Sequence, residues 1–167
     1  MLAPAFFRKC SPTKEITICA WVKARSWRNL DIDYIVSKDD FGQGGPHGYL
    51  LRCSLSGKLN CWLGTGATEF EAMSPEQLEV GRWYHVAATY DGNKSTVFVD
   101  GLERSSLERR GAISPSSYNL RVGRGHFAPD RCFDGVIDEV AVFGRALTAK
   151  EIQSVWRLGL QGKSLAN

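Results

Sequence analysis

The sequence has no long hydrophobic run. None of its apolar stretches approaches the roughly eighteen residues that a membrane-spanning helix requires. The apolar part of residues 1–10 is also too short for a secretory signal. These absences predict a soluble chain with no membrane insertion. They leave open whether it is a cytoplasmic protein or an excised domain of a larger surface protein.

The chain also has no CxxC pair. Its five cysteines stand at positions 10, 19, 53, 61 and 132, an odd number that leaves at least one thiol unpaired and argues against a structural zinc site. Cys53 and Cys61 lie on the same alternating face of a predicted hairpin. A disulfide between them would require a three-residue turn centred on Gly57. We favour the alternative that both are small buried hydrophobic residues.

Neither sign of charge dominates. The formal net charge is +3, and basic residues are interspersed with acidic ones, as in Glu108-Arg109-Arg110. This mixture predicts a solvated surface and no nucleic-acid partner. A length of 167 residues with 43% hydrophobic content predicts one domain with a sizeable core.

The clearest structural signal is a hairpin at 83–101, with the sequence WYHVAATYDGNKSTVFVDG. Two alternating runs flank Asp91-Gly92-Asn93-Lys94, which is the pattern of antiparallel strands joined by a turn. Trp83, His85 and Ala87 are predicted to share one face of the first strand, since side chains alternate with period two.

Further alternating runs predict an all-β sandwich with one helix. The expected strands are 15–24, 34–37, a hairpin within 49–63, 102–110, 118–123 and 132–143. Ser74-Pro75-Glu76-Gln77 predicts a single helical turn within the loop 64–79. Thr148 and Glu151 form a capping-box pattern that predicts a helix over 148–158.

Several motifs carry a family resemblance. The segments WYHVAATYDG and VFVDG are followed by FDGVIDEV at 133–140 and RALTAKEI at 145–152, and ITICAWV at 16–22 precedes them. Together they resemble the laminin-G-like (LamG type 3) branch of the concanavalin A-like lectin/glucanase superfamily. The resemblance implies a jelly roll of two antiparallel sheets and an extracellular or cell-surface location. We expect an irregular arm at 1–14, the domain at 15–160 and a tail at 161–167.

The resemblance also concerns the edge of the sheet. Members of the family usually have a further strand before the Ile16 region, and only Ala5 to Lys9 offers a candidate for it here. A sheet edge left open in this way predicts a homodimer through strand pairing.

A catalytic pair of carboxylates is not evident. Glycosidases of this fold class need two carboxylates on one face, and the nearest approaches are Glu69-Phe70-Glu71 and Asp134 to Glu139. Asp138 and Glu139 are adjacent, so a regular strand would point them in opposite directions. No serine or cysteine can be paired with His47, His85 or His126 on sequence grounds. We therefore expect a protein that is not an enzyme.

Several acidic residues are candidate metal ligands. Asp39, Asp40, Asp130 and Asp134 lie in or beside glycine-rich loops, and Asp138 lies in the motif of the last strand. Calcium takes carboxylate and carbonyl oxygens, and several lectin-like sandwiches carry a rim calcium. Asp134 and Asp138 are the calcium candidates, whereas the competing interpretation makes such Asp-Gly pairs ordinary turn residues. No cofactor is otherwise implied.

The predicted function is carbohydrate recognition by a non-catalytic module. Sugar sites combine an aromatic ring with a few polar groups. We expect stacking from Trp62 and Trp27, and hydrogen bonds from Arg52, Asn60 and Asp130, with His126 as a further candidate. Trp62 faces outward beside Arg52 and Asn60 but would be buried if the sheet packs on both faces, whereas Trp21, Trp83 and Trp156 are expected in the core. The alternatives are a protein-protein adhesion or scaffold domain and, more distantly, a glycoside hydrolase.

Overall fold

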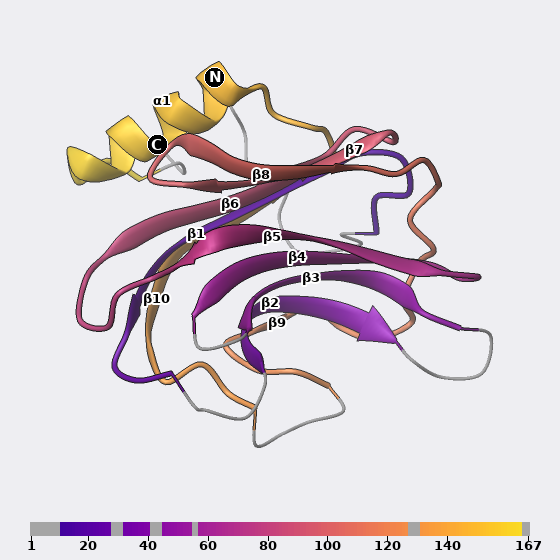
Figure 1. Cartoon of the computed structure of the whole chain (residues 1–167), viewed down its shortest axis with the longest axis horizontal. Coiled ribbons are helices and arrows are strands. Elements are labelled where there is room, and N and C mark those ends of the chain that lie inside the picture. The colour runs from indigo at the N-terminus through magenta and orange to yellow at the C-terminus, as the bar shows by residue number, and fades with distance from the viewer. Residues whose placement is uncertain (1–10, 28–31, 41–44, 55–56, 127–130, 165–167) are drawn as a thin grey trace.

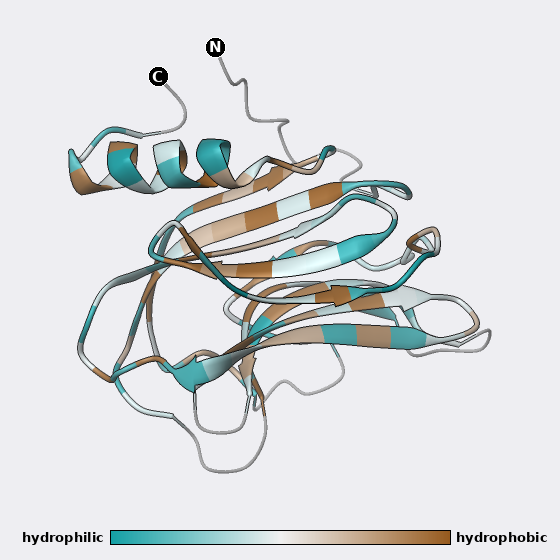
Figure 2. Cartoon of the chain, turned by 45° about the horizontal axis from the view of Figure 1, so that its top comes forward, coloured by the Kyte–Doolittle hydropathy of each residue, from teal (hydrophilic) through white to brown (hydrophobic). Residues whose placement is uncertain are grey.

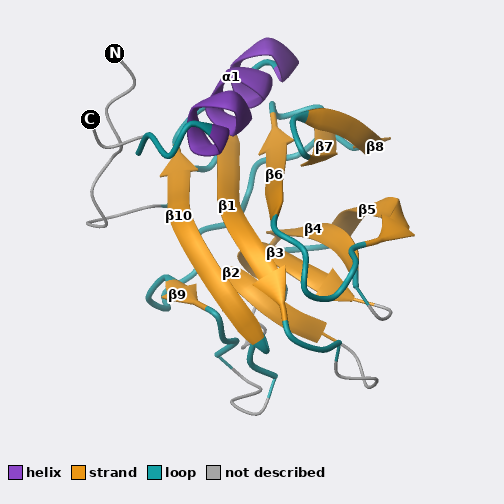
Figure 3. Cartoon of the chain, turned by 90° about the vertical axis from the view of Figure 1, so that its left-hand side faces the viewer, coloured by secondary structure: helices purple, strands orange, loops and turns teal. Residues whose placement is uncertain are grey.

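Two five-stranded antiparallel sheets pack face to face in the computed structural model, which describes residues 11–27, 32–40, 45–54, 57–126 and 131–164. In these ranges one helix is present, and it lies outside the first sheet (Figures 1 and 3). That helix is not long and apolar enough to cross a membrane. The predicted all-β jelly-roll sandwich with a C-terminal helix is confirmed.

The first sheet, sheet A, has the strand order β10-β1-β6-β7-β8. Its strands in chain order are β1 (Ile16–Ala24), β6 (Tyr84–Tyr90), β7 (Lys94–Val99), β8 (Leu102–Glu108) and β10 (Gly135–Phe143). Asp100 and Gly101 form the two-residue turn between β7 and β8, with φ values of +51° and +73°. A turn with two positive φ angles matches the twist of the flanking strands, which explains the Asp-Gly sequence there.

The second sheet, sheet B, has the order β5-β4-β3-β2-β9. Its strands are β2 (Ile32–Asp40), β3 (His47–Ser54), β4 (Lys58–Thr65), β5 (Glu69–Gln77) and β9 (Arg121–Val122). β2 is longer than the expected 34–37, and only two residues of the expected 118–123 are in a strand.

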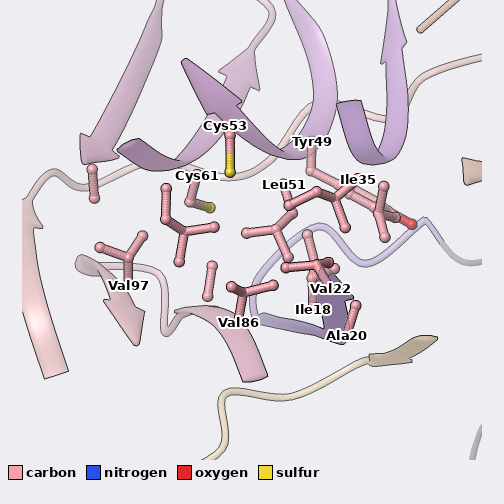
Figure 4. Close-up of a cluster of buried hydrophobic side chains, with 14 of the residues drawn as sticks. Ile18, Ala20, Val22, Ile35, Tyr49, Leu51, Cys53, Cys61, Val86 and Val97 are labelled. Atoms are coloured by element: carbon pink, nitrogen blue, oxygen red, sulfur yellow. The ribbon is translucent and has the colours of Figure 1, made fainter. Parts of the chain in front are cut away.

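The main core fills the space between the sheets. Ile18, Ile35 and Leu51 are fully buried there, together with Cys53 and Cys61 (Figure 4). Both cysteines are free thiols, as favoured from the sequence. The register pairs Cys53 with Leu59 and Cys61 with Leu51, so the two thiols face one core from cross-strand positions that are not directly opposite.

The helix α1 (Ala149–Leu160) covers the outer face of sheet A (Figure 3). The capping box predicted from Thr148 and Glu151 is present at its N-terminus. Hydrophobic and hydrophilic residues alternate along it (Figure 2), and Ile152 and Val155 pack on a smaller core with Cys19 and Phe98 of the sheet.

Two local predictions are wrong. The segment Ser74–Gln77 forms the end of β5 rather than a helical turn, and the Ser74 hydroxyl accepts a hydrogen bond from the Leu59 amide of β4. The cross-strand bonding overrides the local cap signal, and Pro75 is tolerated because β5 is an edge strand. The three tryptophans expected in the core are not buried there: Trp83 is 40% exposed, and Trp21 and Trp156 are half-buried. Trp83 precedes β6 on a face that α1 covers only in part.

Other expectations stay predictions. The strand candidate Ala5 to Lys9 lies outside the described residues. A further strand beside β10, at the edge of sheet A, therefore stays a prediction. The homodimer and the domain limits at 15 and 160 are likewise untested.

Candidate functional site in sheet B

The outer face of sheet B carries a chain of polar side chains from three strands. Arg52 of β3 donates from Nε to Asn60 Oδ1 of β4 at 2.8 Å and from a terminal nitrogen to Glu71 Oε2 of β5 at 2.8 Å. Asn60 Nδ2 donates to the same Glu71 oxygen at 2.9 Å. The Arg52 side chain is 12% exposed and that of Glu71 is 43% exposed. This row of hydrogen-bonded side chains is therefore buried at Arg52 and open to solvent at Glu71.

An apolar cluster lies beside this polar chain. Tyr34, Leu50 and Trp62 form a small buried cluster on the same outer face. Trp62 is only 3% exposed, so the expectation that its ring faces outward as a stacking platform is not met in this structure. The alternative left open from the sequence applies, since the sheet is covered on both faces.

The cover is the loop that follows β9. Ser37 Oγ donates to the carbonyl oxygen of Arg124 at 2.9 Å, and the Arg121 guanidinium donates to that of Gly125 at 3.2 Å. A Cβ at Gly125 would lie 2.5 Å from the Tyr34 ring, so only glycine permits this close approach. The loop therefore lies against the outer face of sheet B through contacts that its glycine makes possible.

His126 sits at the end of the described part of this loop. Its ring stacks on Tyr118 with 3.5 Å between the ring centroids. Tyr118 begins the expected strand 118–123 but was not a predicted site residue, because its contact with His126 joins two segments that lie outside the strands of the structure.

Asp39 of β2 is the most unusual group at this site. It is 1% exposed, and neither carboxylate oxygen has a hydrogen-bond partner among the described residues. Burial raises the pKa of this carboxyl, and the nearby charges of His126, Arg52 and Arg121 act in the opposite direction. The Asp39 carboxyl is therefore a buried polar group without a partner in the described part of the chain, an arrangement that costs free energy.

Not every predicted residue reaches this face. The Trp27 indole donates to the Leu78 carbonyl oxygen at 2.8 Å and packs edge-on against Phe133, in contact with the inter-sheet core. Asp130 lies outside the described residues. The structure thus brings Arg52 and Asn60 together beside Trp62, stacks His126 on Tyr118, and places Trp27 elsewhere.

The calcium candidates do not assemble a ligand set in the described ranges. Asp134 accepts from Arg25 at 3.1 Å and from Ser26 at 2.7 Å, and Asp138 accepts from the Glu139 amide at 2.8 Å. Within the described part of the chain, no group of three or more His, Cys, Asp or Glu residues is arranged to hold a metal ion. These residues do not fit a calcium site, and calcium stays a prediction for the whole chain.

A bulge corrects the expectation for Asp138 and Glu139. The register between β1 and β10 shifts after Cys19, so that Trp21 pairs with Asp138, and Glu139 has φ of +47°. The irregular backbone breaks the period of two. Both carboxylates therefore border one cleft, on the outside of sheet A.

Fold and site together define a class: a jelly-roll β-sandwich with a loop-covered sheet face that joins apolar and polar side chains. The chain belongs to the family described as the concanavalin A-like lectin/glucanases superfamily, in its third laminin-G-type branch, whose family model matches residues 4–153. The family expected from the sequence motifs is thus confirmed. Comparison with curated proteins finds no match.

Solved structures share the fold at low identity. A candidate carbohydrate binding protein from Bacteroides ovatus is 22% identical with a TM-score of 0.69, and the alignment covers 90% of this chain but 43% of that one. The SAP-like pentraxin of Limulus polyphemus is 18% identical with a TM-score of 0.69 over 96% of this chain and 76% of that one. The CBM40 of the Ruminococcus gnavus IT-sialidase, bound to α2,3-sialyllactose, is 16% identical with a TM-score of 0.67 over 86% and 83% of the two chains.

Proposed function

We propose that the protein is a non-catalytic carbohydrate-binding module that recognises glycans at the outer face of sheet B. The observation that carries the proposal is the polar chain Arg52–Asn60–Glu71, which lies beside an apolar cluster and a loop. A mostly apolar site with a few convergent polar groups suits a sugar, whose hydroxyls both donate and accept.

Each group in this site has a role in the proposal. The exposed end of the polar chain, at Glu71, accepts from sugar hydroxyls, and Arg52 and Asn60 hold that carboxylate in place. The stacked His126 and Tyr118 offer a flat aromatic flank. Asp39 accepts from a hydroxyl or water once the loop admits one.

The comparisons support the ligand class. The Bacteroides ovatus structure is named as a carbohydrate binding protein, and the Ruminococcus gnavus domain was solved with bound α2,3-sialyllactose. A domain of a Geobacillus stearothermophilus extracellular arabinanase, solved with arabinotriose, has the same fold at 18% identity and a TM-score of 0.67 over 87% of this chain and 68% of that one. We extend the proposal to an extracellular or surface location on the same grounds.

The test is binding of the purified protein to a broad glycan array, with calcium and again with a chelator. We expect saturable binding that Arg52→Ala weakens by about tenfold or more, because a charged hydrogen bond contributes about 1.5–3 kcal/mol. Loss of binding on chelation would add a calcium ion to the proposal. Incubation with the bound glycan is expected to leave it uncleaved, and cleavage would favour the hydrolase alternative.

The matched control is Arg25→Ala, which removes an arginine whose side chain is 76% exposed and which pairs with Asp134 away from this face. Its binding should equal that of the unmodified protein. Trp62→Ala is a poor probe, because loss of a buried tryptophan costs about 3–5 kcal/mol of folding stability. No binding to any glycan would favour the protein-protein adhesion alternative.

A further inference from the structure

A cleft lies on the side of the molecule opposite the sheet B site, between sheet A and the end of α1. Its volume is about 400 Å³, within the about 300–1,000 Å³ range of small-molecule sites. Strands β1 and β10, the residue before β6, the end of α1 and the turn after it contribute to its lining: Trp21, Trp83, Asp138, Glu139, Leu160 and Lys163. No contact described for the sheet B site involves these residues.

Two tryptophans give the cleft its apolar surface. Trp83 is 40% exposed, so much of its indole is open to a ligand. Trp21 is half-buried, and the last turn of α1 approaches it closely because residue 159 is glycine: a Cβ there would lie 2.2 Å from the Trp21 indole nitrogen. The glycine thus sets the width of the cleft at this end.

The polar groups include both acceptors and donors. The bulge in β10 directs the carboxylates of Asp138 and Glu139 to the cleft, and Lys163 adds an ammonium group. Asp138 is exposed and Glu139 is half-buried, and Glu139 also accepts from Ser164 at 3.1 Å. A ligand meets at least one exposed carboxylate and one exposed donor.

His85 lies beneath this cleft. A small cavity of about 10 Å³ is lined by His85 and Val155 and shares Trp21, Glu139, Gly159 and Lys163 with the larger cleft. His85 is 1% exposed, and neither ring nitrogen has a hydrogen-bond partner among the residues that the structure describes. Burial lowers the pKa of His85 to about 4, so its ring is neutral at pH 7 and offers one donor and one acceptor. Buried polar groups of this kind are costly unless a ligand or water satisfies them.

We propose that this cleft is a second ligand site that binds one pyranose unit, with the sugar ring on the Trp83 indole and its hydroxyls on Asp138, Glu139 and Lys163. A hydroxyl both donates and accepts, which matches a lining that mixes carboxylates with an ammonium group. An organic cation would find the carboxylates and indoles but would be repelled by Lys163. The proposal shares with the proposed function only the ligand class, and it concerns a separate surface.

The experiment is a ¹H-¹⁵N NMR titration of the protein with the methyl glycosides of glucose, galactose, mannose and N-acetylglucosamine, followed at the tryptophan indole signals. At least one sugar should shift the Trp21 and Trp83 signals saturably. The Trp27 signal should stay unchanged, because the Trp27 indole donates a hydrogen bond to the Leu78 carbonyl oxygen away from the cleft. Trp83→Phe identifies the Trp83 signal by its loss.

Variants separate the two sites. Asp138→Asn, which keeps the shape of the side chain, should weaken the cleft affinity about fivefold or more, whereas Arg110→Ala on the exposed segment after β8 should not change it. Arg52→Ala should weaken array binding about tenfold or more while the cleft signals still shift. Array binding that depends on Arg52 with no shift at Trp21 and Trp83 would overturn the cleft proposal alone. Shifts given only by tetramethylammonium would also overturn it, in favour of a cation site.

Discussion

At the scale of the residue, His85 links the stability of the fold to pH. Its backbone amide donates to Asp100 Oδ1 at 3.0 Å, and its ring packs edge-on against Trp21 with centroids 5.6 Å apart. The ring is therefore fixed in place and removed from water. Glu139 and Lys163 are the charged groups that share its cavity.

We expect the protein to lose stability as the pH falls from about 6.5 to about 4. The pKa of His85 is lowered to about 4 in the folded state, so between these values the unfolded chain binds more protons. The free energy of unfolding then falls with falling pH, by up to about 3 kcal/mol from this group. Urea unfolding at a series of pH values measures the slope.

The control for this slope is His85→Gln, which retains a polar side chain that does not titrate. Its free energy of unfolding should vary less with pH over the same window, because the substitution removes the contribution of His85 and leaves the other titrating groups in place. Equal slopes for the two proteins would show that His85 is not buried in its neutral form.

At the scale of the element, α1 depends on its first turn. The Thr148 hydroxyl accepts from the Glu151 amide, and Glu151 accepts from the Thr148 amide at 2.8 Å and from Arg145 at 2.7 Å. Arg145 and the cap together lower the pKa of Glu151 to about 2. A carboxylate whose pKa is lowered by folding stabilises the fold at pH values above the pKa that it has in the unfolded chain. This contribution is lost as the pH falls toward 2.

Two substitutions test this cap by urea unfolding. Thr148→Ala should lower the free energy of unfolding by about 1 kcal/mol at neutral pH. Glu151→Gln should also destabilise at neutral pH, but its difference from the unmodified protein should vanish near pH 2, where Glu151 becomes protonated. The control is Glu103→Gln, an exposed carboxylate of β8. A difference that persists unchanged at low pH would contradict the ionic role of Glu151.

At the scale of the whole molecule, stability rests on the core between the sheets. Leu51 is fully buried at the centre of this core, so Leu51→Ala should cost about 2–5 kcal/mol of unfolding free energy. Val136→Ala is the matched control, because Val136 is 50% exposed, and its effect should stay within about 0.5 kcal/mol. Urea unfolding measures both, and a similar effect of the two would show that the sheets are not packed as described.

Each of the two proposed sites is built from segments that are far apart in the sequence. Arg52, Asn60 and Glu71 come from three strands, whereas the cleft joins β1, β10, the start of β6 and the end of α1. They lie on opposite outer faces of the sandwich, one on each sheet. Two sites placed in this way would let one molecule hold two glycan chains at once, which raises avidity without any new contact.

The sequence by itself determined the elements with strong local signals. Alternation placed β1, β6, β7 and β10, Asp100-Gly101 marked a turn that needs positive φ, and the capping box marked the start of α1. The placement of Arg52 and Asn60 on one face of the hairpin also followed from alternation, whereas the register that pairs them did not. Each of these depends on residues near in sequence, whose geometry is set by backbone periodicity.

Tertiary structure alone decided the rest. The burial of Trp62 depends on its packing with Tyr34 and Leu50 of neighbouring strands, and β5 forms only because β4 pairs with it. The bulge that turns Asp138 and Glu139 to one cleft arises from the register of β10 on β1, and Trp83 is exposed because α1 covers only part of the sheet. These features arise from contacts between distant segments, whose free energy outweighs the local preferences that a sequence pattern records.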